Sequence, residues 1–226
     1  ITATNVISPL ILDFSHAASP TTTLNSLALD TYPLVKSGNV HQASRILAAP
    51  MAEIVEQSAA LGFVNIIPDA DGVVRRVRLL ADLDGVLVPS FLLQAVAEYL
   101  DYDIENIVPV DGFRLTLKQF PVGVMGLSYD VDVPLDGQGN LVVNLAGPLS
   151  PKNYPQSHSA WDLLKSEQQY DFSGKLVFLA DTSVEHDNSG DFSPVPLGRL
   201  FPRSYIFSNA ASSLLNGDFI RPIGTL

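Results

Sequence analysis

Hydrophobic residues at the start of the chain form a β-type apolar run over residues 6–14, which predicts a strand. Residues 15–42 are rich in Ser, Thr, Asn and Pro and show no periodicity, so we expect a long surface loop there. Between Pro50 and Gly62, residues at helical spacing predict a helix packed on a sheet. Gly62 is expected to end that helix in the left-handed conformation.

Two turn signals follow. Asp69-Ala70-Asp71-Gly72 stands between β-rich runs and predicts a β-hairpin over residues 62–79. Asp84-Gly85 predicts a second turn, and Ser90 then begins an amphipathic helix that should end at Leu100.

The second half of the chain mixes strand and helix signals. Turn residues divide residues 107–144 into short strands, as in an antiparallel meander, and Ser159 begins a short helix. Residues 174–180, GKLVFLA, form an apolar run typical of a buried central strand. The prolines of residues 190–202 predict irregular structure, and Ser204 can cap a last helix through Leu215.

These elements together predict an α/β fold. We expect a mixed β-sheet with helices packed on its faces and an inserted antiparallel hairpin or meander. The 226 residues are enough for one domain, 1–226, with a full core.

Composition narrows the function. With 24 acidic and 13 basic residues the formal net charge is −11, so nucleic acid is not an expected partner. The absence of cysteine excludes disulfides, thiolate zinc sites and thiol catalysis. No apolar run reaches the length of a membrane span, so any membrane anchors are expected outside this sequence.

Catalytic and metal signals are weak. A G-x-S-x-G nucleophile motif is missing, and the four histidines stand in loop-like surroundings: His16, His41, His158 and His186. Hard oxygen ligands and one imidazole are offered by Asp69, Asp71, Glu185, His186, Asp187 and Asp191. Val73 to Arg75, however, stand where a calcium loop would need further ligands. We therefore predict neither a catalytic residue, nor a metal site, nor a cofactor.

The dense basic cluster of this acidic chain is Arg75, Arg76 and Arg78. Strand alternation would send Arg76 and Arg78 to one face and Arg75 to the other. These arginines either form internal ion pairs with nearby Asp residues or place one guanidinium in a pocket to bind a carboxylate or phosphate.

A polar loop, DTSVEHDNSGD, follows the run at 174–180, and ligands of α/β proteins commonly bind beyond strand ends. The candidate ligand-binding set therefore joins this loop to the arginines. Its members are Arg75, Arg76, Asp181, Thr182, His186 and Asp187. The expected ligand is a small polar metabolite or anion.

Six segments in order resemble the second class of the CHASE family, the cyclase and histidine kinase associated sensory extracellular domains. The segments are GFVNIIPDADGVVRRVRLL at 62–80, VPSFLLQAVAEYL at 88–100, PLDGQGNLVVNLAGP at 134–148, SAWDLL at 159–164, GKLVFLADTSVEHDNSGDFSPV at 174–195 and FPRSYIFSNAASSLLNGDFI at 201–220. Leu179-Ala180 and Pro202-Arg203 depart from the isoleucine-glycine and proline-glycine pairs usual there. The family's N-terminal βαβ portion is not found in the sequence, so a site shared with it is expected to be incomplete.

The resemblance implies a sensory domain and no catalytic residues. It implies an extracytoplasmic position, periplasmic or extracellular, in a bacterial membrane receptor with flanking transmembrane helices of the same chain. The receptor would control a cytoplasmic output module: an adenylate or guanylate cyclase, a histidine kinase, or a diguanylate cyclase or phosphodiesterase. A homodimer is one possible assembly of the domain. The alternatives are a secreted hydrolase-like domain and a structural protein-interaction module without a small ligand.

Overall fold

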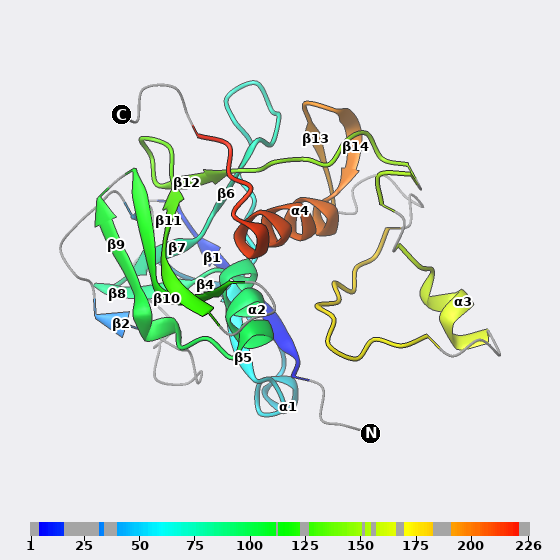
Figure 1. Ribbon diagram of the computed structural model, residues 1–226, viewed down its shortest axis with the longest axis horizontal. Helices are drawn as coiled ribbons and strands as arrows, with labels where there is room; N and C mark the ends of the chain where they lie inside the picture. Colours follow the sequence, from blue (N-terminus) through cyan, green and yellow to red (C-terminus); the bar gives the residue numbers. More distant parts are fainter. Residues whose placement is uncertain are drawn as a thin grey trace.

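The computed structural model describes residues 5–15, 32–33, 40–111, 113–122, 127–150, 152–154, 157–165, 170–182 and 191–221 (Figure 1). The strands are β1 (Ile7–Asp13), β2 (Tyr32–Pro33), β3 (His41–Ala43), β4 (Arg45–Ala48), β5 (Ala60–Phe63), β6 (Arg76–Arg78), β7 (Leu80–Leu83), β8 (Val86–Pro89), β9 (Ile107–Asp111), β10 (Arg114–Val122), β11 (Leu127–Pro134), β12 (Asn140–Val142), β13 (Phe192–Val195) and β14 (Gly198–Pro202). The helices are α1 (Ala52–Val55), α2 (Phe91–Leu100), the 3-10 turn η2 (Ile104–Asn106), α3 (Ala160–Lys165) and α4 (Arg203–Asn216).

Strand β1, expected from residues 6–14, is confirmed and lies between β4 and β5. It pairs in parallel with β5, from Ile7 opposite Ala60 to Leu10 opposite Phe63. The helix expected from Pro50 is wrong beyond the four residues of α1, which bury no side chain. All four residues of β5 are buried, and pairing with β1 satisfies the backbone there, so tertiary contacts override the helical spacing.

A second sheet has the order β2-β8-β7-β3. The Asp84-Gly85 turn that joins β7 to β8 is confirmed, and both residues have positive φ, 54° and 84°, the geometry that suits a two-residue hairpin. The loop predicted for residues 15–42 was wrong where strands β2 and β3 form. The rest of that stretch, at residues 16–31 and 34–39, lies outside the described residues.

Helix α2 is confirmed between Ser90 and Leu100, and Asp101 ends it in the left-handed conformation. Its amphipathic pattern buries Leu92, Val96 and their neighbours against β5, β1 and α4, while Tyr99 is exposed. The helix therefore links the parallel strands to the C-terminal part of the chain.

We expect Ser90→Ala to lower the free energy of unfolding by about 1 kcal/mol. Ser90 is 1% exposed, and its Oγ accepts a hydrogen bond from the backbone N–H of Leu93 at 3.2 Å. Alanine would leave that N–H without its partner at a buried helix end. Urea unfolding followed by circular dichroism measures the change, and an unaltered midpoint would contradict this role of Ser90.

Strands β9, β10 and β11 form the expected antiparallel meander, on the left of Figure 1. The turn at Asp69 to Gly72 also forms. The hairpin predicted around this turn was wrong, because the segments before and after it pair with other strands. Strand β5 joins β1, whereas β6 pairs antiparallel with β12, with Arg78 opposite Asn140 and Arg76 opposite Val142.

Residues 174–180 are not the buried central strand that their sequence predicts. They form neither a helix nor a strand, and Val177 is 55% and Leu179 89% exposed. Leu176 and Phe178 pack on the core, and the Phe178 ring meets Phe91 of α2 edge to face, with the ring centroids 6.2 Å apart. The apolar run is thus partly buried on one side against the core, and it is not enclosed on both sides in a sheet.

The last third of the chain contains two confirmed helices, α3 and α4. Helix α4 starts at Arg203 with Pro202 as its N-cap, so the cap expected from Ser204 was wrong, and Gly217 ends the helix with φ 72°. The irregular structure expected at residues 190–202 was wrong: β13 and β14 pair there as a hairpin. The prolines are tolerated because this two-stranded sheet consists of edges only.

The α/β fold with mixed strand pairing is confirmed. The larger hydrophobic cluster joins α2 and α4 to β6 and to the strands β10 to β12. The smaller cluster lies under β1, β4 and β5 and includes Phe63 and Leu10. The helix expected at Pro50 does not cover the sheet, because α1 buries no residue.

Candidate functional site

A tight turn places two carboxylates beside the arginine cluster. The Asp69 N–H donates to Val73 O at 3.0 Å, and the Gly72 N–H donates back to Asp69 O at 2.8 Å. Gly72 has φ 78°, a conformation that glycine adopts without a steric penalty. The turn therefore holds Asp69 and Asp71 on the side from which Arg75 approaches.

Arg75 and Arg76 are ion-paired within the domain, as one interpretation of the sequence expected. Arg75 donates to Asp69 Oδ2 at 2.8 Å and to both oxygens of Asp71 at 3.0 and 2.8 Å. Hydrogen bonds from Arg75 lower the pKa of Asp71 to about 2, and Asp71 and Asp69 raise the pKa of Arg75. Arg76 pairs with Asp69, and its Nε lies 2.8 Å from Asp136 Oδ2 without the alignment of a hydrogen bond.

Arg78 differs from both neighbours. Its guanidinium stacks over the Phe14 ring, 4.2 Å from the centroid, and no carboxylate pairs with it in the described ranges. Its Nη1 is buried and has no hydrogen-bond partner among those residues. Burial lowers the pKa of Arg78 to about 10, so the guanidinium still carries its charge at neutral pH. A buried, charged donor without an acceptor is costly unless a ligand supplies the acceptor.

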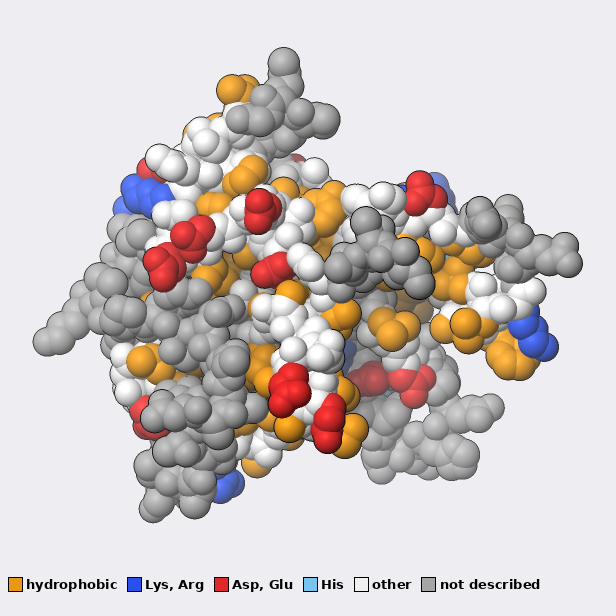
Figure 2. Space-filling model, turned by 90° about the horizontal axis from the view of Figure 1, so that it is seen from below, with side chains coloured by type: hydrophobic (Ala, Val, Ile, Leu, Met, Phe, Trp, Pro, Cys, Tyr) orange, Lys and Arg blue, Asp and Glu red, His pale blue; other side chains and the backbone are white. Residues whose placement is uncertain are grey.

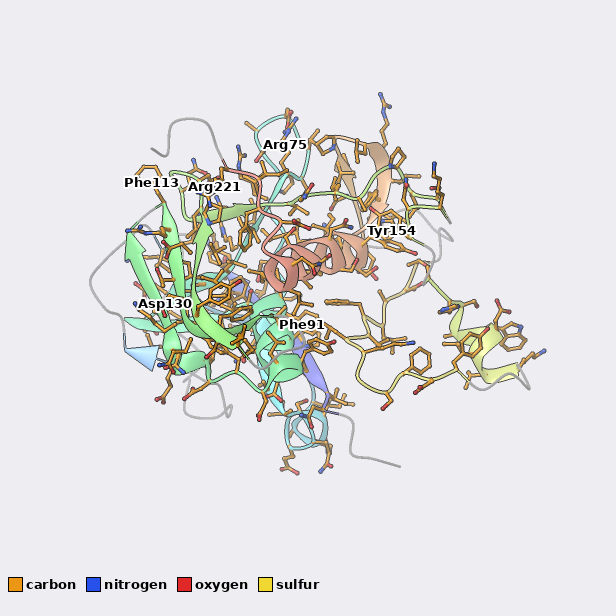
Figure 3. All side chains as sticks on the ribbon, viewed as in Figure 1. Arg75, Phe91, Phe113, Asp130, Tyr154 and Arg221 are labelled. Atoms are coloured by element: carbon orange, nitrogen blue, oxygen red, sulfur yellow. The ribbon has the colours of Figure 1, made fainter. Side chains whose placement is uncertain are left out.

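A pocket of about 520 Å³ opens over these three arginines. Its lining residues are Ile67, Pro68, Asp69, Ala70, Asp71, Arg75, Arg76, Arg78, Gln138 and Asn140. Figure 3 shows Arg75 at the outer edge of the molecule, on the turn that forms one wall. A smaller pocket of about 260 Å³ contains Asp82 and Asp84, but the Asp82 carboxylate is used to accept from the Gly85 N–H at 2.8 Å.

The second wall of the large pocket is organised by Asp136. Its Oδ1 accepts from the backbone N–H groups of Gln138 and Asn140, each at 2.9 Å. The Asn140 Nδ2 lies 3.2 Å from both carboxylate oxygens, and Asn140 Oδ1 faces His41 Nε2 at 2.9 Å. Burial, followed by the charge of Arg78, lowers the pKa of His41.

The structure brings together part of the predicted site. Arg75 and Arg76 both line the pocket, whereas Asp181 and Thr182 are exposed and do not. His186 and Asp187 lie outside the described residues. A binding site that combines the loop after residue 180 with the arginines therefore stays a prediction.

Sequence reasoning missed Arg78, Asn140 and His41 as members of one site. Arg78 and Asn140 are 62 positions apart and meet because β6 pairs with β12. No local pattern signals this pairing.

The described histidines do not form a hydrolase site. His41 contacts Asn140, and the exposed His158 lies against the Tyr170 ring at 5.0 Å. Where the chain is described, neither imidazole is hydrogen-bonded to a serine hydroxyl, and no group of three His, Asp or Glu residues could hold a metal ion. His16 and His186 lie outside those residues.

Comparison with known proteins identifies the family. The family model of the CHASE2 domain matches residues 10–226. The chain belongs to the CHASE2 family. No curated protein and no solved structure matches it.

CHASE2 domains are extracellular sensory parts of cyclase and histidine kinase receptors and are not catalytic. No helix in the described portion of this CHASE2 domain is long and apolar enough to cross a membrane. Both pocket walls come from segments that carried the family resemblance: residues 62–80 supply the arginines, and residues 134–148 supply Gln138 and Asn140. The structure thus joins two separated parts of the CHASE2 sequence at one pocket.

Proposed function

We propose that this CHASE2 domain senses a small anion, a carboxylate or phosphate compound, in the arginine pocket. It would lie on the periplasmic or extracellular side of a bacterial receptor, held by flanking transmembrane helices of the same chain. Anion binding would then control a cytoplasmic cyclase, histidine kinase, or diguanylate cyclase or phosphodiesterase module. The family supports the sensory role, and the pocket supports the ligand class.

The observation that carries the proposal is the buried Nη1 of Arg78, a donor without a protein acceptor in the described residues. A guanidinium presents several N–H groups in one plane and binds carboxylate or phosphate oxygens through two of them. Arg75 and Arg76 are already occupied by carboxylates, so Arg78 is the group that a ligand would satisfy.

The other wall residues favour a small ligand over a polyanion. Asp69 and Asp71 place negative charge at the edge of the pocket and would repel additional phosphate groups. Ile67 and Pro68 supply apolar surface, and the exposed Gln138 has an amide that can donate to a ligand oxygen.

Arg78→Met is expected to weaken anion binding at least about thirtyfold, or about 2 kcal/mol, because the mutation removes the donor and its charge. Thermal-shift screening of organic acids, inorganic phosphate, sulfate and nucleotides would first find a probe, and titration calorimetry would then compare the proteins. A ligand at 100 times its dissociation constant stabilises the fold by about 2.7 kcal/mol, which such a screen detects.

Arg199→Met is the matched control, since it removes the same charge from an exposed position on β14. It should bind the probe as the unmodified protein does. The proposal fails if no anion binds, or if Arg78→Met and Arg199→Met bind equally. Loss of binding in Thr182→Ala but not in Arg78→Met would instead favour a site in the loop that follows residue 180.

A second candidate role is protein association. Trp161 and Leu164 on α3 are 63% and 85% exposed, and Figure 2 shows apolar side chains gathered on the projecting right-hand margin, where Figure 1 places α3. Large exposed apolar side chains favour contact with another surface. Light scattering across protein concentrations, with Leu164→Ser for comparison, tests whether this region forms a homodimer.

A further inference from the structure

His41 belongs to the wall of the anion pocket without lining it. It opens β3, where it pairs with Ala81 of β7, and its side chain is half-buried. The imidazole reaches the pocket through Asn140, whose Oδ1 lies 2.9 Å from His41 Nε2. Asn140 in turn lines the pocket next to Arg78, its partner in the β6–β12 ladder.

The orientation of Asn140 determines which ring nitrogen of His41 can exchange a proton. Asn140 Nδ2 donates to Asp136, so its Oδ1 faces His41 and can only accept. Nε2 therefore carries a hydrogen in both the neutral and the charged imidazole. The proton that His41 gains on acidification goes to Nδ1.

Two charged side chains act on His41 from the described elements around it. Arg78, on β6, lies on the pocket side and disfavours the imidazolium, whereas Asp136, in the turn before β12, favours it. The strand partner on β7 is the uncharged Ala81. Burial is the largest influence, and with Arg78 it outweighs the hydrogen bonds of Asn140 and Gln138, so the pKa of His41 is lowered in the empty domain.

We propose that anion binding at Arg78 is linked to proton uptake by His41, so that this domain binds its anion more tightly in an acidic medium. This inference rests on the proposed anion pocket. A bound anion neutralises the field of Arg78 and adds a negative charge on the pocket side of Asn140. Both changes favour the imidazolium, and linkage requires that the imidazolium favours the anion equally.

The direction of the effect follows from the two protonation equilibria. Well above the pKa of His41 the imidazole is neutral, and the anion binds Arg78 alone. As the pH falls below the pKa of the anion-bound domain, binding takes up a proton and the affinity rises. Below the pKa of the empty domain both forms are charged, and the affinity reaches a plateau.

The test uses inorganic sulfate, whose charge is constant between pH 5 and 8, in titration calorimetry at several pH values. The unmodified domain is expected to bind sulfate about tenfold more tightly at pH 5.5 than at pH 8, within the usual range of coupling between sites. Repeating the titration in buffers of different ionisation enthalpy should reveal uptake of part of one proton. His41→Gln should remove both effects, whereas His158→Gln, at an exposed imidazole, should keep them.

Titration of the His41 ring by NMR provides an independent measurement if His41→Gln does not fold. Sulfate should raise the pKa of His41. If sulfate binds, depends on Arg78 and shows neither pH dependence nor a change at His41, the linkage is wrong and the anion pocket stands. If neither sulfate nor any carboxylate or phosphate binds, the proposed function itself fails.

Discussion

Leu92→Asp is expected to unfold the domain, lowering its free energy of unfolding by about 4 kcal/mol or more. Leu92 is fully buried in the larger hydrophobic cluster, on the face of α2 that meets the rest of the core. A carboxylate there would either stay charged without a partner or take up a proton at a cost. Urea titration followed by circular dichroism should show no folded baseline, or a midpoint at much lower urea.

Val177→Asp makes the matched chemical change at a position that is 55% exposed. We expect its stability to stay within about 0.5 kcal/mol of the unmodified domain, because surface substitutions seldom do more. Comparing Val177→Asp with Leu92→Asp also tests whether residues 174–180 lie at the surface. Unfolding of Val177→Asp as severe as that of Leu92→Asp would mean that residues 174–180 form a buried strand after all.

Gly62→Ala is expected to destabilise the domain by about 3 kcal/mol, because β5 and α2 approach too closely for a side chain. A Cβ on Gly62 would lie 2.4 Å from Phe91 N, 2.5 Å from Phe91 Cα and 2.7 Å from the carbonyl carbon of Ser90. These are backbone atoms at the start of α2, so no rotamer change relieves the clash. The helix would have to move off the strand, with loss of packing on both.

Gly198→Ala serves as the control for Gly62→Ala. A Cβ at Gly198 meets no atom within 4 Å, and the backbone there is not in the left-handed region. Its expected change in unfolding free energy is within about 0.5 kcal/mol. Equal midpoints for the two alanine variants would show that β5 and α2 do not meet at Gly62.

The sequence alone could predict some residues of the candidate site but not all of them. Arg75 and Arg76 could be chosen because basic residues are dense there in an acidic chain, and Asp69 and Asp71 were nearby in sequence. Which guanidinium is left for a ligand could not be known. It depends on Asp136, which reaches Arg76 from the turn before β12, and on Phe14, over which Arg78 stacks.

The sequence alone determined the turns and helix ends that depend on a few adjacent residues. The turn at Asp84-Gly85, the Ser90 cap of α2, the meander and the Gly217 end of α4 all form as expected. These residues suit the local geometry without help from elsewhere in the chain, because glycine accepts a positive φ and a capping hydroxyl bonds the backbone next to it. The family, too, followed from the order of the sequence segments.

Tertiary structure alone decided what each apolar segment packs against. Residues 60–63 continue a helical spacing, yet they form β5 because β1 offers them backbone partners, and Gly62 serves close packing instead of ending a helix. Residues 174–180 have a strand-like composition but lie on α2 with Val177 and Leu179 outside. The hydrophobicity of a segment indicates that part of it will pack against another element. Which element it packs against depends on residues far away in the sequence, and a local pattern does not contain that information.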